Sequence, residues 1–297
     1  MLHFQPVTIN DKDTIQAFFS KSTFRNCDFS FSNVFAWEHF FNTTFVIENQ
    51  FLFIRFQIAG ELPGYLFPLG EGDLKTAIEC ILQDAEERGS DFRLYSITQK
   101  MFDLIEKIMP NQFIYETNRS WFEYIYTSKD LIHLVGKKLQ AKRNHINKFK
   151  RTYEWEYLPI TRAIIPDCLK LYERWCKENG GCNTEEMLIE EGQATRKVFA
   201  NYEKMGLTGG ALRINGEILA YSYGQALTAD TFGVHAEKCL YEIDGGFTMM
   251  NQQFAEHNCA DYTYINREED LGKESLRQAK MSYHPSILLE KGVVRKK

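Results

Sequence analysis

The charged residues between positions 266 and 280 are the strongest candidates for chemistry in this sequence. Asn266, Glu268 and Asp270 follow a predicted strand, and the predicted helix after them carries Arg277 and Lys280. Loops between strands and helices are where α/β folds tend to place ligands. A carboxylate there could act as a general base on an attacking amine, and a cation could hold a carboxylate or phosphate. Helix capping and surface charge are the alternative, because acids near a helix start are favoured anyway.

Three further side chains are candidates because of what they can donate or accept. His235 and Lys238 come at the end of a predicted strand, and His235 could carry a proton because its reference pKa lies near neutrality. Tyr283 could supply a proton to a leaving group. For each of these residues a packing role is the alternative.

Residues 131–153 reverse the sign of a chain whose formal net charge is −5. Apolar residues recur at helical spacing, which predicts one helix with a buried stripe. The other face is cationic and has no acid among its members, which are Lys137, Lys138, Lys142, Arg143, Lys148, Lys150 and Arg151. The functional interpretation is a docking surface for a polyanion, either tRNA or a phospholipid headgroup. A solvated helix between domains is the alternative.

The elements that must position these residues are predicted in two similar series. Each half begins with a strand and two helices, continues through a three-strand meander, and ends with helix, strand and helix. Asn215-Gly216 predicts a tight hairpin in the second meander. We therefore expect an α/β (α+β) protein with mixed sheets flanked by helices. Its domains are expected at 1–128 and 154–297, joined by a basic linker helix at 129–153.

The order of elements and several motifs resemble known families. The order is similar to that of the GNAT acyltransferase fold, here present twice in tandem. The sequences Lys142–Phe149, Asn266–Gly272 and Leu276–Pro285 resemble the family typified by the C-terminal domain of phosphatidylglycerol lysyltransferases. That family looks like a tandem pair of GNAT folds related to the FemXAB peptidyltransferases. The similarity covers nearly the whole chain.

This resemblance implies an acyltransferase that uses aminoacyl-tRNA as its donor and an amine or hydroxyl as its acceptor. It favours Arg143, Lys148, Glu268, Asp270, Arg277 and Lys280 as site residues. With the residue-level arguments, the expected catalytic residues are Glu268, Asp270 and His235. The expected substrate-binding residues are Arg143, Lys148, Lys238, Asn266, Arg277, Lys280 and Tyr283. The donor's phosphates are expected at Lys142, Gly245 and Gly246.

An acyl-CoA-dependent N-acyltransferase and a non-catalytic ligand-binding module on the same fold are the alternatives. In GNAT enzymes a glycine-rich turn at a helix N-terminus receives the pyrophosphate of acetyl-CoA. Here that place is taken by Glu242-Ile243-Asp244-Gly245-Gly246-Phe247, whose acids disfavour a diphosphate although its glycines permit close approach. No metal or redox cofactor is required, because an activated ester needs only positioning, proton removal and charge stabilisation.

The amino-acid composition argues against several other classes of protein. The sequence of 297 residues is 44% hydrophobic, enough for more than one domain. Its acidic balance argues against nucleic-acid binding over the whole surface. No membrane span or signal peptide is predicted, so we expect a cytoplasmic protein whose membrane contact, if any, is peripheral. The cysteines are odd in number and contain no C-x-x-C pair, which predicts reduced thiols and no zinc site.

Overall fold

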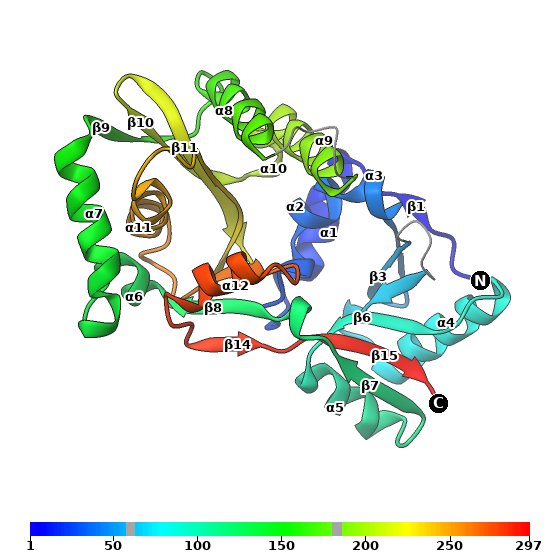
Figure 1. Ribbon diagram of the computed structural model, residues 1–297. Helices are drawn as coiled ribbons and strands as arrows, with labels where there is room; N and C mark the ends of the chain where they lie inside the picture. Colours follow the sequence, from blue (N-terminus) through cyan, green and yellow to red (C-terminus); the bar gives the residue numbers. More distant parts are fainter. Residues whose placement is uncertain (58–62, 180–185) are drawn as a thin grey trace. The chain divides into compact units, whose positions relative to one another are not determined.

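The chain divides into two compact units (Figure 1). The computed structural model describes residues 1–57, 63–179 and 186–297. Unit 1 comprises Met1–Tyr124, Glu269–Ala279 and Leu288–Lys297, and unit 2 comprises Ile125–Glu268 and Lys280–Ile287. Both units therefore consist of several separate segments of the sequence. The domains expected at 1–128 and 154–297 are each one continuous segment. Those boundaries stay a prediction.

Unit 1 is built around a mixed sheet. Its strands are β1 (Gln5–Pro6), β2 (Thr44–Glu48), β3 (Phe51–Phe56), β4 (Gly64–Leu66), β5 (Leu69–Gly70), β6 (Arg93–Ile97), β7 (Phe113–Thr117) and β15 (Gly292–Lys296). Its helices are α1 (Lys12–Phe19), α2 (Phe31–Ala36), α3 (Glu38–Phe41), α4 (Leu74–Glu87) and α5 (Gln99–Ile108), with short 3-10 turns η1 (Ile9–Asp11), η2 (Cys27–Phe29) and η3 (Arg119–Trp121). The strand order is β1-β2-β3-β4-β6-β15-β7, with β5 on β3.

Local signals explain several of these elements. Residues Asn49 and Gln50, both with positive φ, form the two-residue turn of the β2–β3 hairpin. Asp73 caps α4, since its side chain accepts a hydrogen bond from the backbone N–H of Thr76 at 3.0 Å. The strand predicted at the start of the first half is short: β1 covers only Gln5–Pro6, and the 3-10 turn η1 begins at Ile9.

Unit 2 holds most of a second mixed sheet, and its helices cover that sheet. Its own elements are α6 (Ser128–His133), η4 (Lys137–Leu139), α7 (Gln140–Thr152), β9 (Trp155–Pro159), α8 (Ile165–Glu178), α9 (Glu186–Ala200), α10 (Tyr202–Met205), β10 (Thr208–Ile214), β11 (Glu217–Ala226), β12 (Thr231–Cys239) and α11 (Gly246–Asn258). Four elements contain residues of both units, namely β8 (Glu123–Thr127), β13 (Tyr264–Glu269), α12 (Glu274–Met281) and β14 (Ile287–Leu289). The strand order is β14-β8-β13-β12-β11-β10-β9.

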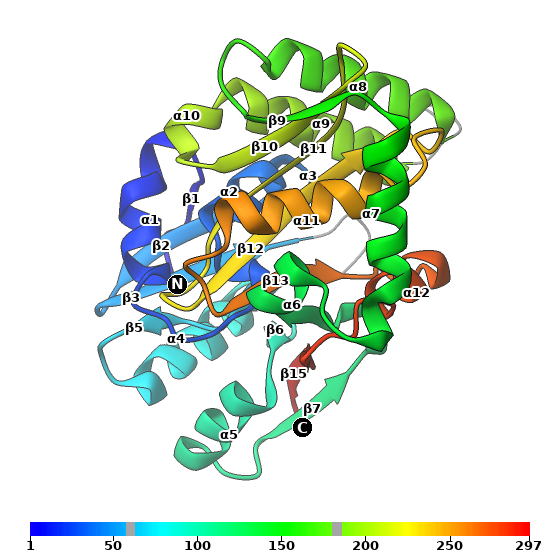
Figure 2. The ribbon, with the colours of Figure 1, turned by 90° about the vertical axis from the view of Figure 1, so that its left-hand side faces the viewer.

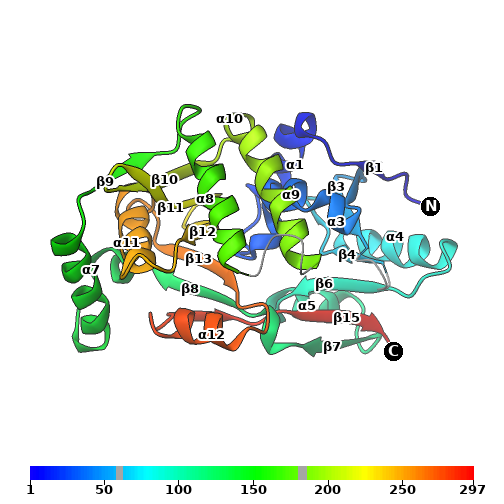
Figure 3. The ribbon, with the colours of Figure 1, turned by 45° about the horizontal axis from the view of Figure 1, so that its top comes forward.

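The helices of unit 2 pack on both faces of its sheet. Helix α8 contacts β11 and β12, and Figure 3 shows α8 and α9 over that face. Helix α11 contacts β10, β11 and β12 from the other face and packs against α7 (Figure 2). The β10–β11 hairpin turns at Asn215 and Gly216, both with positive φ, as the sequence predicts. These are the elements that position the candidate site.

The prediction of one continuous linker helix is wrong. Helix α6 ends at His133. Leu134 and Gly136 follow with φ of 50° and 88°, and α7 begins only at Gln140. The Arg143 guanidinium donates hydrogen bonds to the carbonyl oxygens of Leu134 and Gly136, which stabilises the break. Val135, an apolar residue of the segment 131–153 for which a buried stripe was predicted, is 69% exposed. The cationic segment is therefore an interrupted pair of helices within unit 2.

The cysteines follow the sequence prediction only in part. Cys27, Cys80, Cys168, Cys239 and Cys259 are reduced thiols. Cys176 takes part in a disulfide, which the prediction of reduced thiols did not foresee. Cys182 lies outside the described residues.

Candidate functional site

His235 and Glu268 meet where two parallel strands separate. Strands β12 and β13 pair at three positions, ending at Gly233 and Asn266. Continued in the same register, they would bring His235 opposite Glu268. The backbone pairing stops before these two residues, and their side chains meet instead: His235 Nδ1 lies 2.8 Å from Glu268 Oε1. The two side chains are 3% and 22% exposed, so this contact is largely shielded from water.

A β-bulge places His235 in this position. The pairing of β11 with β12 shifts between Tyr223, opposite Ala236, and Gly224, opposite Val234. His235 is the extra residue of the bulge, and bulges often redirect a side chain near a functional site. Because Nδ1 faces a carboxylate, we assign the ring proton to Nδ1, which leaves Nε2 as an acceptor. Nε2 is buried without a hydrogen-bond partner among residues 1–57, 63–179 and 186–297.

Two neighbours hold the turn in the backbone at Glu268, near the end of strand β13. Glu268 has φ 57°, a conformation that costs free energy for a residue with a side chain. The buried Asn266 accepts a hydrogen bond from the backbone N–H of Glu268 at 2.8 Å. The Lys280 ammonium donates to the carbonyl oxygens of Arg267 at 2.5 Å and Glu268 at 3.2 Å. Asn266 and Lys280 therefore act on the backbone of this turn.

Aromatic and cationic side chains surround the same turn within unit 2. The ring of Tyr283 lies edge-on to that of Tyr126, with centroids 6.4 Å apart. The Arg267 guanidinium lies 5.2 Å and the Lys142 ammonium 4.0 Å from the centroid of the Tyr283 ring. Burial raises the pKa of Tyr283, so its hydroxyl stays protonated at neutral pH.

Asp270 belongs to unit 1 and is fully engaged there. Arg277 donates to its two oxygens at 2.8 and 3.2 Å, and Tyr124 donates at 2.5 Å. Arg119 and the backbone N–H of Gly272 add bonds of 3.3 and 2.9 Å. Burial alone would raise the pKa of Asp270, but the hydrogen bonds, from Arg277 first, hold it well below its usual value. A carboxylate so stabilised is a weak base.

The remaining expected substrate-binding residues are engaged elsewhere in unit 2. Arg143 caps the end of α6, and Lys148 forms an exposed ion pair with Asp244. Lys238 is 2.6 Å from the Glu191 carboxylate and lies over the ring of Trp175, 3.5 Å from its centroid.

The glycines expected to receive a phosphate have a packing role. Gly245 has φ 76°, and a Cβ added there would lie 2.9 Å from the carbonyl oxygen of His145 on α7. The backbone N–H of Gly246 donates to Ile243 O at 2.9 Å, and that of Asp244 donates to the Tyr153 hydroxyl at 3.2 Å. These amides already have acceptors. The start of α11 is thus shaped for close contact with α7.

Sequence reasoning missed Arg267, Glu237 and Glu191. Arg267 is 12% exposed and forms an ion pair with Glu237 at 3.1 Å. The sequence positions of Arg267 and Glu237 could have indicated them. Arg267 directly precedes Glu268 on β13, and Glu237 lies two residues after His235 on β12. The contact of Glu191 with Lys238 joins α9 to β12, and no local signal predicts it.

A cluster in unit 1 has the ligand atoms of a metal site. Cys27, Asp28 and Glu123 offer ligand atoms within 4.8 Å of one another. The Lys291 ammonium lies 2.5 Å from Glu123 and 2.8 Å from Asp28, so a cation of the chain itself already contacts these carboxylates. We therefore assign no metal to it.

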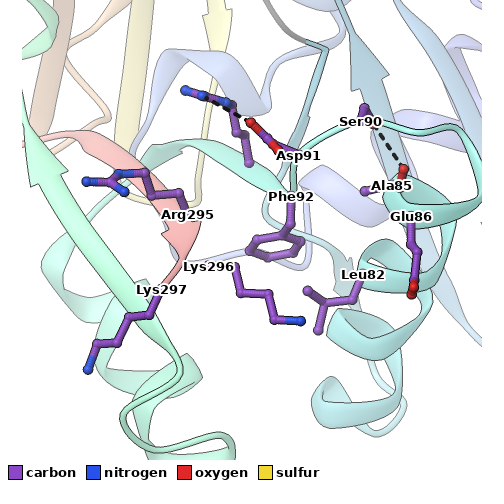
Figure 4. Close-up of a pocket in the computed structure, with 10 residues that line it drawn as sticks. Leu82, Ala85, Glu86, Ser90, Asp91, Phe92, Arg295, Lys296 and Lys297 are labelled. Carbon is purple, nitrogen blue, oxygen red and sulfur yellow. Dashed lines mark hydrogen bonds and ion pairs between the residues drawn. The ribbon is translucent and has the colours of Figure 1, made fainter.

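A hollow of about 500 Å³ lies in unit 1, between the end of α4 and β15 (Figure 4). Phe92, Leu82 and Lys296 lie along it, and Asp91 and Arg93 form an ion pair at its edge. None of the expected site residues lines it. The candidate site is accordingly the His235–Glu268 pair with the side chains around it.

Solved structures with a similar fold are known. The chain is an α/β protein with two mixed sheets flanked by helices. It is similar to a crystal structure of a conserved protein of unknown function from Bacteroides thetaiotaomicron, with 44% identity, full coverage of both chains and a TM-score of 0.96. L-PGS from Bacillus licheniformis aligns with 16% identity over 97% of this chain and 92% of that one, with a TM-score of 0.65. FemX aligns with 8% identity over 98% and 97%, with a TM-score of 0.63. At the last two identities the likeness concerns the fold alone.

A family assignment follows from the sequence match. The family model described as phosphatidylglycerol lysyltransferase, C-terminal, matches residues 19–294, so the chain belongs to that family. An uncharacterised protein from Mycoplasmoides gallisepticum is 25% identical over 175 residues, which are 58% of this chain and 55% of that protein. The chain thus spans about half the length of this curated relative. No helix in the described ranges is long and apolar enough to cross a bilayer.

Proposed function

We propose that this chain transfers an aminoacyl group from aminoacyl-tRNA to an amine or hydroxyl acceptor. The observation that carries the proposal is the shielded contact of His235 Nδ1 with Glu268 Oε1, which leaves Nε2 as an acceptor for a proton. The family match supports the class of reaction. The likeness to L-PGS and FemX supports a scaffold suited to it.

The transfer needs one proton carrier. The acceptor's nitrogen or oxygen attacks the ester carbonyl carbon of the donor while His235 Nε2 takes the acceptor's proton. The bond between that carbon and the ribose oxygen then breaks, and the protonated imidazole returns the proton to the leaving oxygen. Glu268 orients the ring and stabilises the imidazolium that forms between the two steps. Asp270 takes up no proton in this scheme, because its oxygens are held by Arg277 and Tyr124.

The cations before and along α7 supply a surface for the donor's phosphates. Lys137, Lys138, Lys150 and Arg151 are exposed, as is Lys148 in its pair with Asp244. They lie in unit 2, the unit that also holds His235. Phosphate contacts of this kind make binding depend steeply on salt.

Binding of aminoacyl-tRNA at two salt concentrations tests the donor assignment. We expect affinity to fall at least about tenfold between about 50 and about 200 mM salt. Replacing Lys150 and Arg151 together by Glu should weaken binding strongly. The control Lys170→Glu, on α8, should not. Binding that ignores salt, or that both variants weaken equally, contradicts this assignment.

The transfer itself is tested with isotope-labelled aminoacyl-tRNA and a pool of small amines and hydroxyl compounds. Mass spectrometry should detect a labelled amide or ester that requires the protein. Calorimetry with acetyl-CoA is the opposing test. Micromolar binding of acetyl-CoA together with absent aminoacyl transfer would replace the proposal by an acyl-CoA-dependent N-acyltransferase, although the amides of Asp244 and Gly246 already have acceptors.

A further inference from the structure

Two cations share one tyrosine ring beside the candidate site. The Lys142 ammonium lies 4.0 Å from the Tyr283 ring centroid, and the Arg267 guanidinium carbon lies 5.2 Å from the same centroid. Arg267 is 12% exposed and Tyr283 is 6% exposed, and Lys142 is partly buried. All three residues belong to unit 2. The cluster therefore concentrates positive charge in a region that water reaches only in part.

The charges of this cluster do not balance. Glu237 is the carboxylate of the cluster, and its Oε1 lies 3.1 Å from Arg267 Nη2. Lys142 forms no ion pair within the described ranges of the chain. Burial, and then repulsion by Arg267, lowers the pKa of Lys142, and the attraction of Glu237 does not restore it. Two cations against one carboxylate leave a net positive charge that a bound anion would neutralise.

The position of the cluster indicates which anion this is. Arg267 directly precedes Glu268 on β13, and Glu268 holds the imidazole of His235. Lys142 lies in the first turn of α7, the helix that carries exposed cations further along. In an aminoacylated RNA only the terminal ribose separates the reacting ester from that nucleotide's own 5′-phosphate. A phosphate has enough acceptor oxygens to bridge an ammonium and a guanidinium.

We propose that Lys142 and Arg267 form a subsite for the 5′-phosphate of the donor's terminal nucleotide. This inference rests on the proposed function, because the His235–Glu268 pair must be the place where the ester reacts. The subsite fixes the donor's end, while the exposed cations of α7 contact the rest of the molecule.

Adenosine 5′-monophosphate and adenosine form a matched pair of probes, because they differ only in the phosphate. Calorimetry with the full chain should show the monophosphate binding at least about tenfold more tightly, as expected for charge-assisted hydrogen bonds. Lys142→Gln should remove this preference, and Lys142→Arg should retain most of it. Lys170→Gln is the control, since Lys170 lies on α8 of the same unit and pairs with Asp167 at the surface.

Transfer kinetics separate failure of this inference from failure of the proposed function. If transfer occurs, Lys142→Gln should raise the KM for the aminoacylated donor about tenfold or more and leave the KM for the acceptor unchanged. Equal binding of the two probes, or an unchanged donor KM in Lys142→Gln, overturns the subsite even while transfer continues. A retained preference for the monophosphate in a protein without any transfer activity would uphold the phosphate site and overturn the proposed reaction.

Discussion

A β-bulge in β12 places His235 against Glu268, and the role proposed for His235 depends on that contact. Replacing His235 by Gln keeps a polar side chain but removes the proton acceptor. We expect His235→Gln to lower the rate of aminoacyl transfer at saturating substrates by about 10²–10⁴-fold. Glu268→Gln should give a smaller loss, because the ring remains but is held less well. Rapid-quench measurement of a single turnover checks both.

A second histidine provides the matched control. His257 is exposed on α11 and stacks on Tyr157, with ring centroids 4.2 Å apart. His257→Gln should leave the transfer rate within about twofold of the wild-type rate. If all three variants lose activity alike, or if His235→Gln retains full activity, the assignment of the base is wrong.

Glu123 in unit 1 shows how burial changes a carboxyl group. Its side chain is fully buried and accepts hydrogen bonds from the backbone and thiol of Cys27. Lys291 is its neutralising partner, while Asp28 and Glu269 compete for the same ammonium at 2.8 and 3.8 Å. Burial raises the pKa of Glu123 to about 7, and the attraction of Lys291 opposes this only in part. Folding therefore retains a proton on this group at mildly acidic pH.

A pH dependence of stability follows. In the unfolded chain Glu123 loses its proton near the ordinary value of 4.5, whereas in the folded protein it keeps the proton up to about pH 7. Between these values the folded state binds more protons, so the free energy of unfolding falls as the pH rises. Urea unfolding from about pH 5 to pH 7 should show this fall in the wild type and a weaker one in Glu123→Gln.

The control for this prediction is an exposed carboxylate in the same unit. Glu116 pairs with Arg295 at the surface, and its pKa is lowered by that contact, so its titration lies below this pH range. Glu116→Gln should therefore leave the slope of stability with pH unchanged between about pH 5 and pH 7. A wild-type stability that rises over this range would contradict the raised pKa of Glu123.

At the scale of elements, the contact of α7 with α11 depends on Gly245, the residue just before α11. Gly245 and Gly216 both have positive φ, but a Cβ at Gly216 meets no atom within 4 Å, whereas one at Gly245 meets His145 O at 2.9 Å. Gly216→Ala should cost about 1 kcal/mol of unfolding free energy for backbone strain alone. Gly245→Ala should cost at least about 2 kcal/mol, because the helices must also move apart. Urea unfolding of both variants makes the comparison, and equal losses would contradict the close packing.

Sequence patterns predicted the elements better than the contacts between them. The bounds of β2 and α12, and the Asn215-Gly216 turn, were predictable because they depend on alternation and on residues adjacent in sequence. The helix break at Leu134–Gly136 was not, because the apolar stripe continues through it and only Gly136 signals it. His235 and Glu268 were each predicted as catalytic. Their contact was not, since it depends on a bulge and on the register of two strands separated by α11.

At the scale of the whole molecule, the C-terminal strand shows that neither unit is a simple half of the chain. β15 pairs with both β6 and β7, which lie far from it in the sequence. The side chain of Val294 on β15 is fully buried in unit 1, whereas Lys296 on the same strand is exposed. The apolar run that forms β15 is short, and its partners are distant in sequence, so no local pattern predicts where it inserts.

This insertion makes the stability of unit 1 depend on the last strand. Val294→Asp buries an unpaired charge and should lower the stability of unit 1 by about 3–5 kcal/mol. Lys296→Asp should change it by less than about 0.5 kcal/mol. Hydrogen exchange read by mass spectrometry should then show faster exchange in β6 and β7 of Val294→Asp, with β10 and β11 of unit 2 retaining their protection. Because each unit has its own core, equal loss of protection in both sheets would mean that the two units unfold as one cooperative body.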